Sequence, residues 1–504
     1  MTSVLFGKGM PIGRMVMKTG LYMLFAAGLL LAGVFVAGLQ ADDVLKPEPG
    51  EEFPGGATTA KCCIGTSMAF MQPPPNMDKK RGLDWRVGRG MFKKIWVSAP
   101  ASTKASDGLG PLYNARSCMR CHPRDGRGHP PSANWPKDDS ISMFLRLSIP
   151  PQTSEQEKMM AEHKLYAVPD PTYGGQLQDL AIQGHEAEGK MHITYTEQKV
   201  ELAGGEQVSL RVPSYKITNW GYGKPHKQLM ISPRIAPQMI GLGLLEAIPE
   251  KQIMANADPL DKDGDGISGK VSRVWSHKEN KVMLGRYGWK AITPTLFDQG
   301  DSAMAGDIGI SNPVFPHASG DCTDRQPRCM DAPNGNMIRD GDLEIGPKLN
   351  NVLMFYSRNL AVPKRHKHDD PTILQGKALF NGIGCTSCHK PNFITSDSAP
   401  GGKHLANQKI WPYSDLLLHD MGQGLSDNRP VGNARGNEWR TAPLWGIGQT
   451  KTVSGHTYFL HDGRARGIKE AILWHGGEAK AARDAFAGLD KKDRERLIAF
   501  VNSL

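Results

Sequence analysis

Two copies of the motif C-x-x-C-H constrain this chain more than any other feature. One is Cys118-Met-Arg-Cys121-His122 and the other is Cys385-Thr-Ser-Cys388-His389. The motif is typical of c-type haem attachment, in which two thiols add to the porphyrin vinyl groups and the histidine binds the iron. A redox or zinc C-x-x-C site would give no reason for a histidine after both copies. The sequence therefore predicts two covalently bound haem c groups, with His122 and His389 as iron ligands.

The remaining four of the eight cysteines form two pairs along the sequence. Cys322 and Cys329 flank a short polar loop and are predicted to form a disulfide. Cys62 and Cys63 are adjacent near the start of the body. For that second pair, three interpretations stay open: a surface redox pair, a strained vicinal bridge, or pairing of each cysteine with another one.

Residues 1–41 predict an export segment. Lys8, Arg14 and Lys18 precede an uncharged apolar run over residues 21–39, and a small residue stands at Ala41. A basic flank followed by an apolar stretch and a small residue is typical of a secretory signal. The run approaches the length of a membrane span, so a cleaved signal peptide and a retained anchor both stay open. Either outcome places the body outside the cytoplasm.

The sequence around the two motifs repeats itself. Gly88-Arg-Gly-Met-Phe92 precedes the first motif and Gly376-Lys-Ala-Leu-Phe380 precedes the second, and both fit a short helix. Arg234-Ile-Ala-Pro237 follows the first motif and Arg440-Thr-Ala-Pro443 follows the second, each with two glycines after it. We therefore expect an internal duplication of one haem-binding unit.

Two insertions enlarge the first copy. Residues 191–217 alternate in polarity around a pair of glycines and predict a β-hairpin. Asp261, Asp263 and Asp265 occupy the first acidic positions of a calcium loop, but Ser272 stands where an EF-hand carries its bidentate glutamate. A complete EF-hand is excluded. A calcium loop of another type and a solvated acidic turn both stay open.

These features, with several longer stretches, resemble the bacterial di-haem oxidoreductase family, whose members are often described as peroxidases or thiol oxidoreductases. The stretches are Phe53–Thr59, Asp107–Ser117, Tyr173–Gln178, Gly285–Ala291, Asp415–Met421, Glu438–Trp445, His461–Ala465 and Trp474–Glu478. The family is similar to the di-haem cytochrome c peroxidases and to the di-haem enzyme that matures a tryptophylquinone. The resemblance implies a periplasmic protein with a mainly α fold, in which calcium is a common companion. The parts that it implies are two cytochrome c-like haem domains, over residues 42–345 and 346–504.

A catalytic di-haem protein needs one saturated haem and one haem with an open position. Alignment of Trp289 with His461 places Ala303 opposite His475. Alanine cannot bind iron, so the haem on His122 is the candidate open site. His475 is predicted to be the second ligand of the haem on His389. The alternative is that another residue, such as His461 or Met421, supplies that ligand.

An open site also needs polar groups that move protons. The candidates are Trp289, Gln299, Gln176 and Glu188. The resemblance places a distal glutamate where this chain has Phe297, which would move the acid to Glu188 or Glu186. Three histidines are further candidates for distal ligands, although a lone histidine is more often structural: His129, His185 and His419.

The predicted function is reduction of hydrogen peroxide with electrons from a small donor protein of the cytochrome c or cupredoxin type. A non-catalytic di-haem electron carrier and an oxidase of a partner protein's side chains or thiols are the alternatives. The net charge of +10 is spread along the chain without a nucleic-acid motif, so no nucleic-acid partner is expected. Contact with a membrane is expected only through an uncleaved N-terminal segment.

Overall fold

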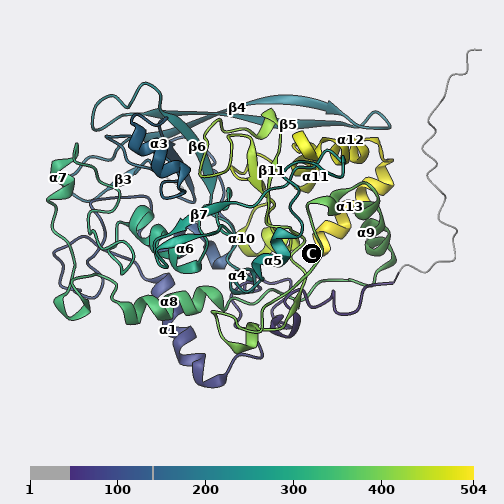
Figure 1. The fold of residues 1–504 in the computed structure, drawn as a ribbon, viewed down its shortest axis with the longest axis horizontal. Helices are drawn as coiled ribbons and strands as arrows, with labels where there is room; N and C mark the ends of the chain where they lie inside the picture. The colour runs from purple at the N-terminus through teal and green to yellow at the C-terminus, as the bar shows by residue number, and fades with distance from the viewer. Residues whose placement is uncertain (1–45, 139–140) are drawn as a thin grey trace, which may run out of the picture. The chain divides into compact units, whose positions relative to one another are not determined.

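The computed structural model describes residues 46–138 and 141–504, so the predicted export segment lies outside the described residues. About 30% of the chain is helix and 17% is strand. The strands form six separate antiparallel pairs in the described ranges, and long irregular segments connect them (Figure 1). The predicted mainly α fold is therefore wrong. The many glycines and prolines favour turns and loops over long helices.

Two helices frame the first C-x-x-C-H motif. Helix α1 (Gly82–Lys93) packs against α8 (Pro347–Arg358). A methyl group on Gly88 would lie 2.2 Å from the carbonyl oxygen of Val352, so only glycine allows this close approach. We call α1, the motif helix α2 (Cys118–Cys121) and α8 the first unit.

Two further helices frame the second motif in the same way. Helix α9 (Pro371–Gly382) packs against α13 (Lys491–Ser503). A methyl group on Gly376 would lie 2.0 Å from the carbonyl oxygen of Arg496. We call α9, the motif at Cys385 and α13 the second unit. The matching glycine contacts support the predicted duplication.

The two units belong to one compact body, Leu45–Leu504. Helix α8 starts directly after the predicted domain boundary at residue 345, yet it packs on α1. The boundary itself stays a prediction.

A long β-hairpin extends to the second unit. Strands β4 (Lys190–Glu201) and β5 (Gln207–Thr218) pair over their full length, which confirms the predicted hairpin. The hairpin runs along the top of Figure 1 to α12 (Lys480–Gly488). At its turn, the amide of Ala203 donates to the carbonyl of Ala487 at 2.9 Å. Leu202 and Leu210 pack into the same apolar cluster as the last helices.

The other elements are short. The helices are α3 (Ser154–Ala161), α4 (Leu242–Glu246), α5 (Glu250–Met254), α6 (Leu296–Ala303), α7 (Pro327–Met330), α10 (Thr450–Ser454) and α11 (Ile468–Leu473). The strand pairs are β1 (Leu112–Tyr113) with β3 (Leu180–Ala181), β2 (Met143–Ser148) with β6 (Met230–Ile235), β7 (Arg273–Ser276) with β8 (Lys281–Leu284), β9 (Phe393–Ile394) with β10 (Lys409–Ile410), and β11 (Leu418–Asp420) with β12 (Glu438–Arg440). The predicted disulfide between Cys322 and Cys329 is present.

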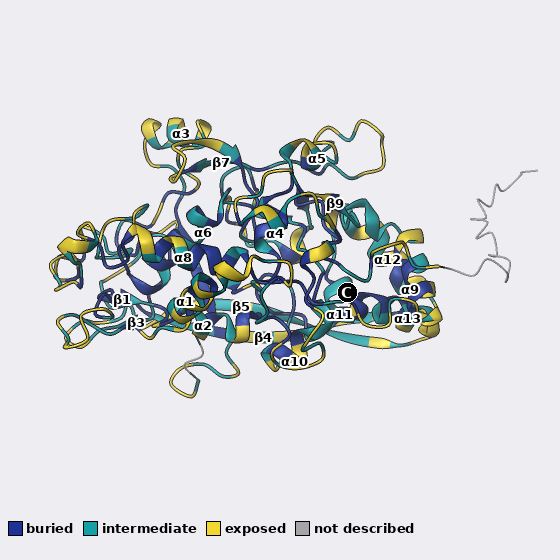
Figure 2. Ribbon diagram, turned by 90° about the horizontal axis from the view of Figure 1, so that it is seen from below, coloured by how far each residue is buried: buried dark blue, intermediate teal, exposed yellow. Residues whose placement is uncertain are grey.

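Fully buried side chains include Tyr356 of α8 in the first unit and Phe500 of α13 in the second, and Figure 2 marks buried residues in both helices. Gly241 and Gly446, the first of the two glycines after each repeat, both start a helical turn with a left-handed φ of 72°. A methyl group on Gly241 would collide with Trp445, and one on Gly446 would collide with Ile240 and Phe70. Each repeat therefore packs its turn into the same central core. In the described ranges, the helices are too short or too polar to cross a bilayer.

Candidate functional site

The histidines of the two C-x-x-C-H motifs have the same environment. Nδ1 of His122 lies 2.7 Å from the carbonyl oxygen of Pro237, and Nδ1 of His389 lies 2.8 Å from that of Tyr413. Donation from Nδ1–H to a carbonyl leaves the Nε2 lone pair for a metal. Burial lowers the pKa of both histidines to about 4, so both imidazoles are neutral. Two thiols and a neutral, oriented imidazole in each motif fit a covalently attached haem.

Aromatic rings hold each motif histidine in place. Phe92 lies 6.1 Å from His122 and Phe380 lies 6.1 Å from His389, measured between ring centroids. Each phenylalanine also packs on an aromatic ring of the facing helix. These contacts are Phe92 with Tyr356 at 5.5 Å and Phe380 with Phe500 at 5.2 Å. The two units thus repeat one histidine-binding geometry.

His475 has the same donor arrangement as the motif histidines. It follows α11, and its Nδ1 lies 2.7 Å from the carbonyl oxygen of Ala471, which leaves Nε2 for a ligand. Burial lowers the pKa of His475. The charge of His475 in turn lowers the pKa of His389, so the two imidazoles lie within electrostatic reach of each other. This geometry suits the predicted role of second ligand, which stays a prediction.

In the described first repeat, Ala303 stands at the position of His475. Helix α6 begins at Leu296, seven positions after Trp289, and α11 begins at Ile468, seven positions after His461. The two helices therefore start at matching positions of the repeat. Seven residues further on, α6 ends at Ala303 where the second repeat has His475. The methyl side chain of Ala303 offers no ligand atom.

An acid that the sequence analysis missed lies beside the first motif. Asp307 belongs to a single π-helical turn (Met304–Ile308), and its carbonyl accepts from the amides of Asn114 and Ala115 at 2.9 and 3.0 Å. Burial and the charge of Asp307 raise the pKa of the Cys118 thiol to about 12, which places the carboxyl within electrostatic reach of the motif. Its position, four residues after Ala303, was the signal that could have identified it.

Asp307 has two polar partners. Nε2 of Gln176 donates to its Oδ1 at 2.9 Å, and Nη2 of Arg146 lies 3.9 Å from the same oxygen. Burial raises the pKa of Asp307, although Arg146 and the hydrogen bond from Gln176 oppose this shift. Gln176 is thus one predicted site residue that the structure brings to the acid.

The other predicted catalytic residues make their polar contacts elsewhere in the described structure. Glu188 accepts from the amide of Gln178 and from Nε2 of Gln326, both at 2.7 Å, so both carboxyl oxygens are occupied. Trp289 donates from Nε1 to the carbonyl of Ile235 at 2.9 Å. Gln299 accepts from the hydroxyl of Thr293 at 2.8 Å. Their predicted roles stay predictions.

Both ring nitrogens of His419 face carboxylate oxygens. Its Nε2 lies 2.8 Å from Asp415 Oδ2, and its Nδ1 lies 2.6 Å from Glu478 Oε2. Burial opposes protonation, but hydrogen bonds with Asp415, Cys388 and Glu478 raise the pKa of His419 to about 12. The residue is therefore a buried imidazolium beside the second motif.

The remaining candidate histidines have other surroundings. His129 is half-buried and its Nδ1 lies 2.8 Å from the carbonyl of Pro130. His185 is half-buried, and burial followed by the charge of Arg328 lowers its pKa.

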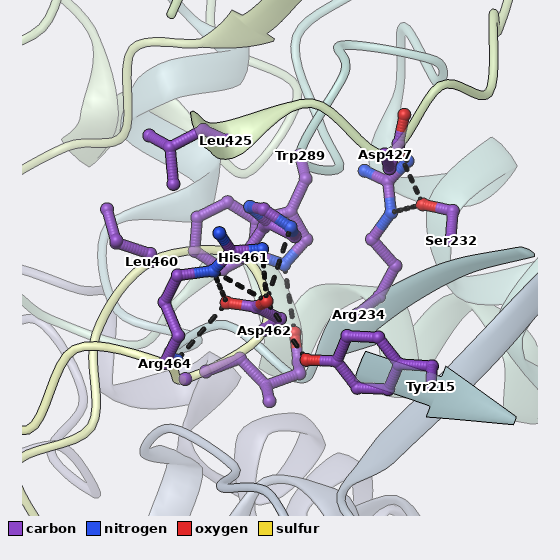
Figure 3. Close-up of polar contacts among 12 residues, drawn as sticks. Tyr215, Ser232, Arg234, Trp289, Leu425, Asp427, Leu460, His461, Asp462 and Arg464 are labelled. Atoms are coloured by element: carbon purple, nitrogen blue, oxygen red, sulfur yellow. Dashed lines mark hydrogen bonds and ion pairs between the residues drawn. The ribbon is translucent and has the colours of Figure 1, made fainter. Parts of the chain in front are cut away.

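The two repeats bind each other across a polar network. The amide of Ile235 in the first repeat donates to the carbonyl of His461 at 2.7 Å, and the amide of Arg440 in the second donates to that of Trp289 at 2.9 Å. Figure 3 shows Trp289 and His461 beside the buried ion pairs of this network. Asp462 pairs with Arg464, Nε to Oδ2, at 2.9 Å.

Buried carboxyl groups differ between the two parts of the chain. Six described carboxyls have a pKa raised chiefly by burial, and all lie before residue 345: Asp125, Glu188, Asp301, Asp307, Asp321 and Glu344. The pKa is about 7 for Asp125, Asp301 and Glu344. After residue 345, three buried or half-buried carboxyls have a lowered pKa because neighbouring cations outweigh burial: Asp427, Asp462 and Glu478.

The acidic loop has the geometry of a cation site. Carboxylate oxygens of Asp261, Asp263 and Asp265 all lie within 4.8 Å of one another. The loop leads to Ser268, whose hydroxyl donates to Glu478 at 2.9 Å. Calcium at this loop stays a prediction.

Comparisons with known proteins agree with the resemblance. A family model described as "Di-haem oxidoreductase, putative peroxidase" matches residues 51–504. Among curated proteins, none gives a significant match. A structure of hydrazine synthase from Kuenenia stuttgartiensis, pressurised with xenon, matches at 13% identity over 71% of this chain and 90% of that one. Its TM-score is 0.26, so this likeness carries no argument about fold or function.

Proposed function

Since the chain belongs to the di-haem oxidoreductase family, we propose that it reduces hydrogen peroxide at the first unit, with electrons delivered through the second. The reaction takes one peroxide, two electrons and two protons to two waters. The proposal rests on two neighbouring features of the first repeat: a position where the iron ligand is missing, and an acid close to it. Ala303 stands where the second repeat has His475, and Asp307 lies four residues beyond it.

A haem held by Cys118, Cys121 and His122 would supply the redox chemistry that peroxide reduction needs. The chain's own contribution is a proton. Because burial raises the pKa of Asp307, its carboxyl holds a proton at a higher pH than an exposed aspartate does. General acid catalysis works best when the pKa of the acid lies near the operating pH.

Gln176 and Arg146 position this acid. The amide of Gln176 donates to Oδ1 of Asp307 at 2.9 Å, so the second carboxyl oxygen is left to carry the proton. Arg146, at 3.9 Å, lowers the pKa of Asp307 and so allows the carboxyl to release the proton. Gln176 and Arg146 thus both oppose the effect of burial on the pKa of Asp307.

In the second unit, the chain would hold a haem between two imidazoles. His389 and His475 both direct Nδ1 to a backbone carbonyl and keep Nε2 for iron. Buried cations near this unit, Arg464 and His419, are each paired with a carboxylate. A saturated haem in neutralised surroundings suits storage and relay of single electrons.

The further parts of the proposal are a periplasmic location, a small donor protein of the cytochrome c or cupredoxin type, and a calcium ion on the acidic loop. Each rests on the sequence analysis. The net charge of +10 favours an acidic donor, because opposite charges accelerate encounter.

The ferric absorption and EPR spectra of the purified protein test the proposal. We expect one low-spin and one high-spin haem, together with peroxide-dependent oxidation of a reduced donor cytochrome. Two low-spin haems without turnover would instead assign the chain to non-catalytic electron transfer. A high-spin haem without peroxide turnover would point to oxidation of another substrate.

A further inference from the structure

The adjacent residues Cys62 and Cys63 lie on a tethered surface loop. Before the pair, the amide of Ala60 donates to the carbonyl of Val362, and its own carbonyl accepts from the amide of Lys364, both at 2.9 Å. After the pair, Phe70 is fully buried in the central core. Both ends of the loop are therefore fixed, and the pair is held at one place on the body.

The two sulfurs of this loop converge. Sγ of Cys62 lies 2.9 Å from Sγ of Cys63, with Cys62 exposed and Cys63 half-buried. Cys63 has a left-handed φ of 64°, which is unusual for a residue with a side chain. The amide and hydroxyl of Thr66 both donate to the carbonyl of Cys63, at 3.1 and 2.7 Å, and hold this conformation.

Other cysteines are not available to this pair. Cys322 is bonded to Cys329, and the remaining four belong to the two C-x-x-C-H motifs. All eight cysteines lie in the described residues. Of the three interpretations that the sequence left open, pairing elsewhere is therefore excluded in this structure.

We propose that Cys62 and Cys63 are a redox-active vicinal couple that exchanges two electrons with disulfide compounds. The exposed Cys62 thiolate attacks one sulfur of the substrate disulfide, forms a mixed disulfide and releases one thiol. The sulfur of Cys63 then attacks that of Cys62, forms the Cys62–Cys63 bond and releases the second thiol. The two protons of the couple pass to the two thiols released, so one disulfide is reduced as one is formed.

The exchange is reversible because the product bond is strained. Cα atoms of adjacent residues lie about 3.8 Å apart across a trans peptide, whereas disulfides usually span about 4.4–6.8 Å between Cα atoms. Strained and exposed disulfides are the easily reduced ones. The hydrogen bond with Cys63 and burial raise the pKa of Cys62, so attack at neutral pH is slow.

The Cys322–Cys329 bond is the matched control within the same chain. Its Cα atoms lie 6.1 Å apart, within the usual range, and Cys329 is only 1% exposed. We expect reduced glutathione to open the Cys62–Cys63 bond at a concentration at least ~10-fold lower than it needs for Cys322–Cys329. Opening of both bonds together, or of Cys322–Cys329 first, would overturn the proposal.

Intact mass spectrometry of the haem-loaded protein gives the direct test. The protein is reduced mildly and then treated with oxidised glutathione. Wild type should lose the mass of two hydrogens and keep no glutathione, whereas Cys62→Ser and Cys63→Ser should each keep one. Wild type that carries two glutathiones, or that does not react, would contradict the couple.

A bidentate thiol reagent provides an independent measurement. Phenylarsine oxide should bind the reduced wild type once and neither serine variant, because it needs two converging thiols. Equal haem content in all three proteins verifies that the variants fold. Peroxide turnover should be unchanged in Cys62→Ser, so failure of this proposal and failure of the proposed function give different results. Binding of phenylarsine oxide to either single variant would show that the pair does not act as one site.

Discussion

Beside the first motif, half-buried Asp307 has Nη2 of Arg146 3.9 Å from its Oδ1, whereas in the second repeat fully buried Asp462 contacts Arg464 at 2.9 Å. Burial disfavours ionisation of both carboxyls, but only Asp462 has a cation close enough to reverse the effect. The two regions share one histidine geometry and differ in this balance of charge. In the first repeat the pKa of Asp307 is raised, whereas in the second the neighbouring cations lower the pKa of Asp462.

Asp307→Asn is expected to have the largest effect on peroxide turnover. The amide cannot donate the proton that the carboxyl supplies, so peroxide turnover should fall by roughly 10²–10⁴-fold, the usual contribution of a general acid. Haem content and the ferric spectrum should stay as in wild type. Steady-state kinetics with a reduced donor cytochrome measure the loss.

Glu188→Gln is the matched control for Asp307→Asn. Glu188 is also buried with a raised pKa, but both of its oxygens are bonded within the protein. Its turnover should stay within about threefold of wild type, since small changes of that size carry less than 1 kcal/mol. A larger loss in Glu188→Gln than in Asp307→Asn would assign the acid to Glu188.

Replacement of His475 by glycine should give both haem sites the same ferric spin state. Without the second imidazole, the haem on His389 loses its low-spin state, so the ferric EPR spectrum should show high-spin iron at both sites. Both haems should remain attached, because the four motif cysteines are untouched. Ala303→Gly is the control and should leave the spectrum unchanged. A low-spin signal that survives in His475→Gly would exclude this ligand.

Glu344→Gln is expected to change how stability depends on pH. Burial and the repulsion of Asp107 raise the pKa of Glu344 to about 7, from an ordinary value of about 4.5. The folded state therefore binds more protons than the unfolded state between about pH 4.5 and 7, and stability falls as the pH rises through that window. The free energy of unfolding of wild type should therefore fall by about 1–3 kcal/mol across this window, and that of the glutamine variant should not.

Denaturation at pH 4.5, 6 and 7.5 measures that slope. Asp107→Asn is the partner control, because removal of the neighbouring charge should lower the pKa of Glu344 and reduce the same slope. Equal slopes in wild type and Glu344→Gln would show that this carboxyl is not protonated in the folded protein.

Removal of calcium is expected to have the smallest effect. A ligand that binds only the folded state stabilises it by mass action, so EGTA should lower the melting temperature by a few degrees, on the order of 2–4 °C. The second haem should respond more than the first, because Ser268 connects the loop to Glu478 and so to His419 beside Cys388. An unchanged melting temperature, with no calcium in elemental analysis, would leave the solvated acidic turn as the interpretation.

Much of this site follows from local sequence patterns. The two C-x-x-C-H motifs and the short helix before each of them could be predicted, because each depends on residues within a few positions. The hairpin and the Cys322–Cys329 bond are confirmed for the same reason. Short-range spacing carries this information.

The rest depends on contacts between distant segments. Strands β2 and β6 pair although more than eighty residues separate them, so local periodicity gave no sign of that sheet and the fold class was wrong. Asp307 was missed because its partner Gln176 lies 131 positions earlier. The pKa of a buried acid depends on cations brought near it by the fold, and the sequence order does not reveal them.

The hairpin also imposes an order on folding. Arg494 donates to the carbonyl of Ala203 across a sequence separation of 291 residues, and Leu202 and Leu210 find their apolar neighbours in the last helices. During synthesis, the tip of the β4–β5 hairpin therefore stays exposed until the last helix has been made. Both C-x-x-C-H segments are made before that closure. Burial of the hairpin tip is therefore among the last steps of folding, because its contacts join segments 291 residues apart.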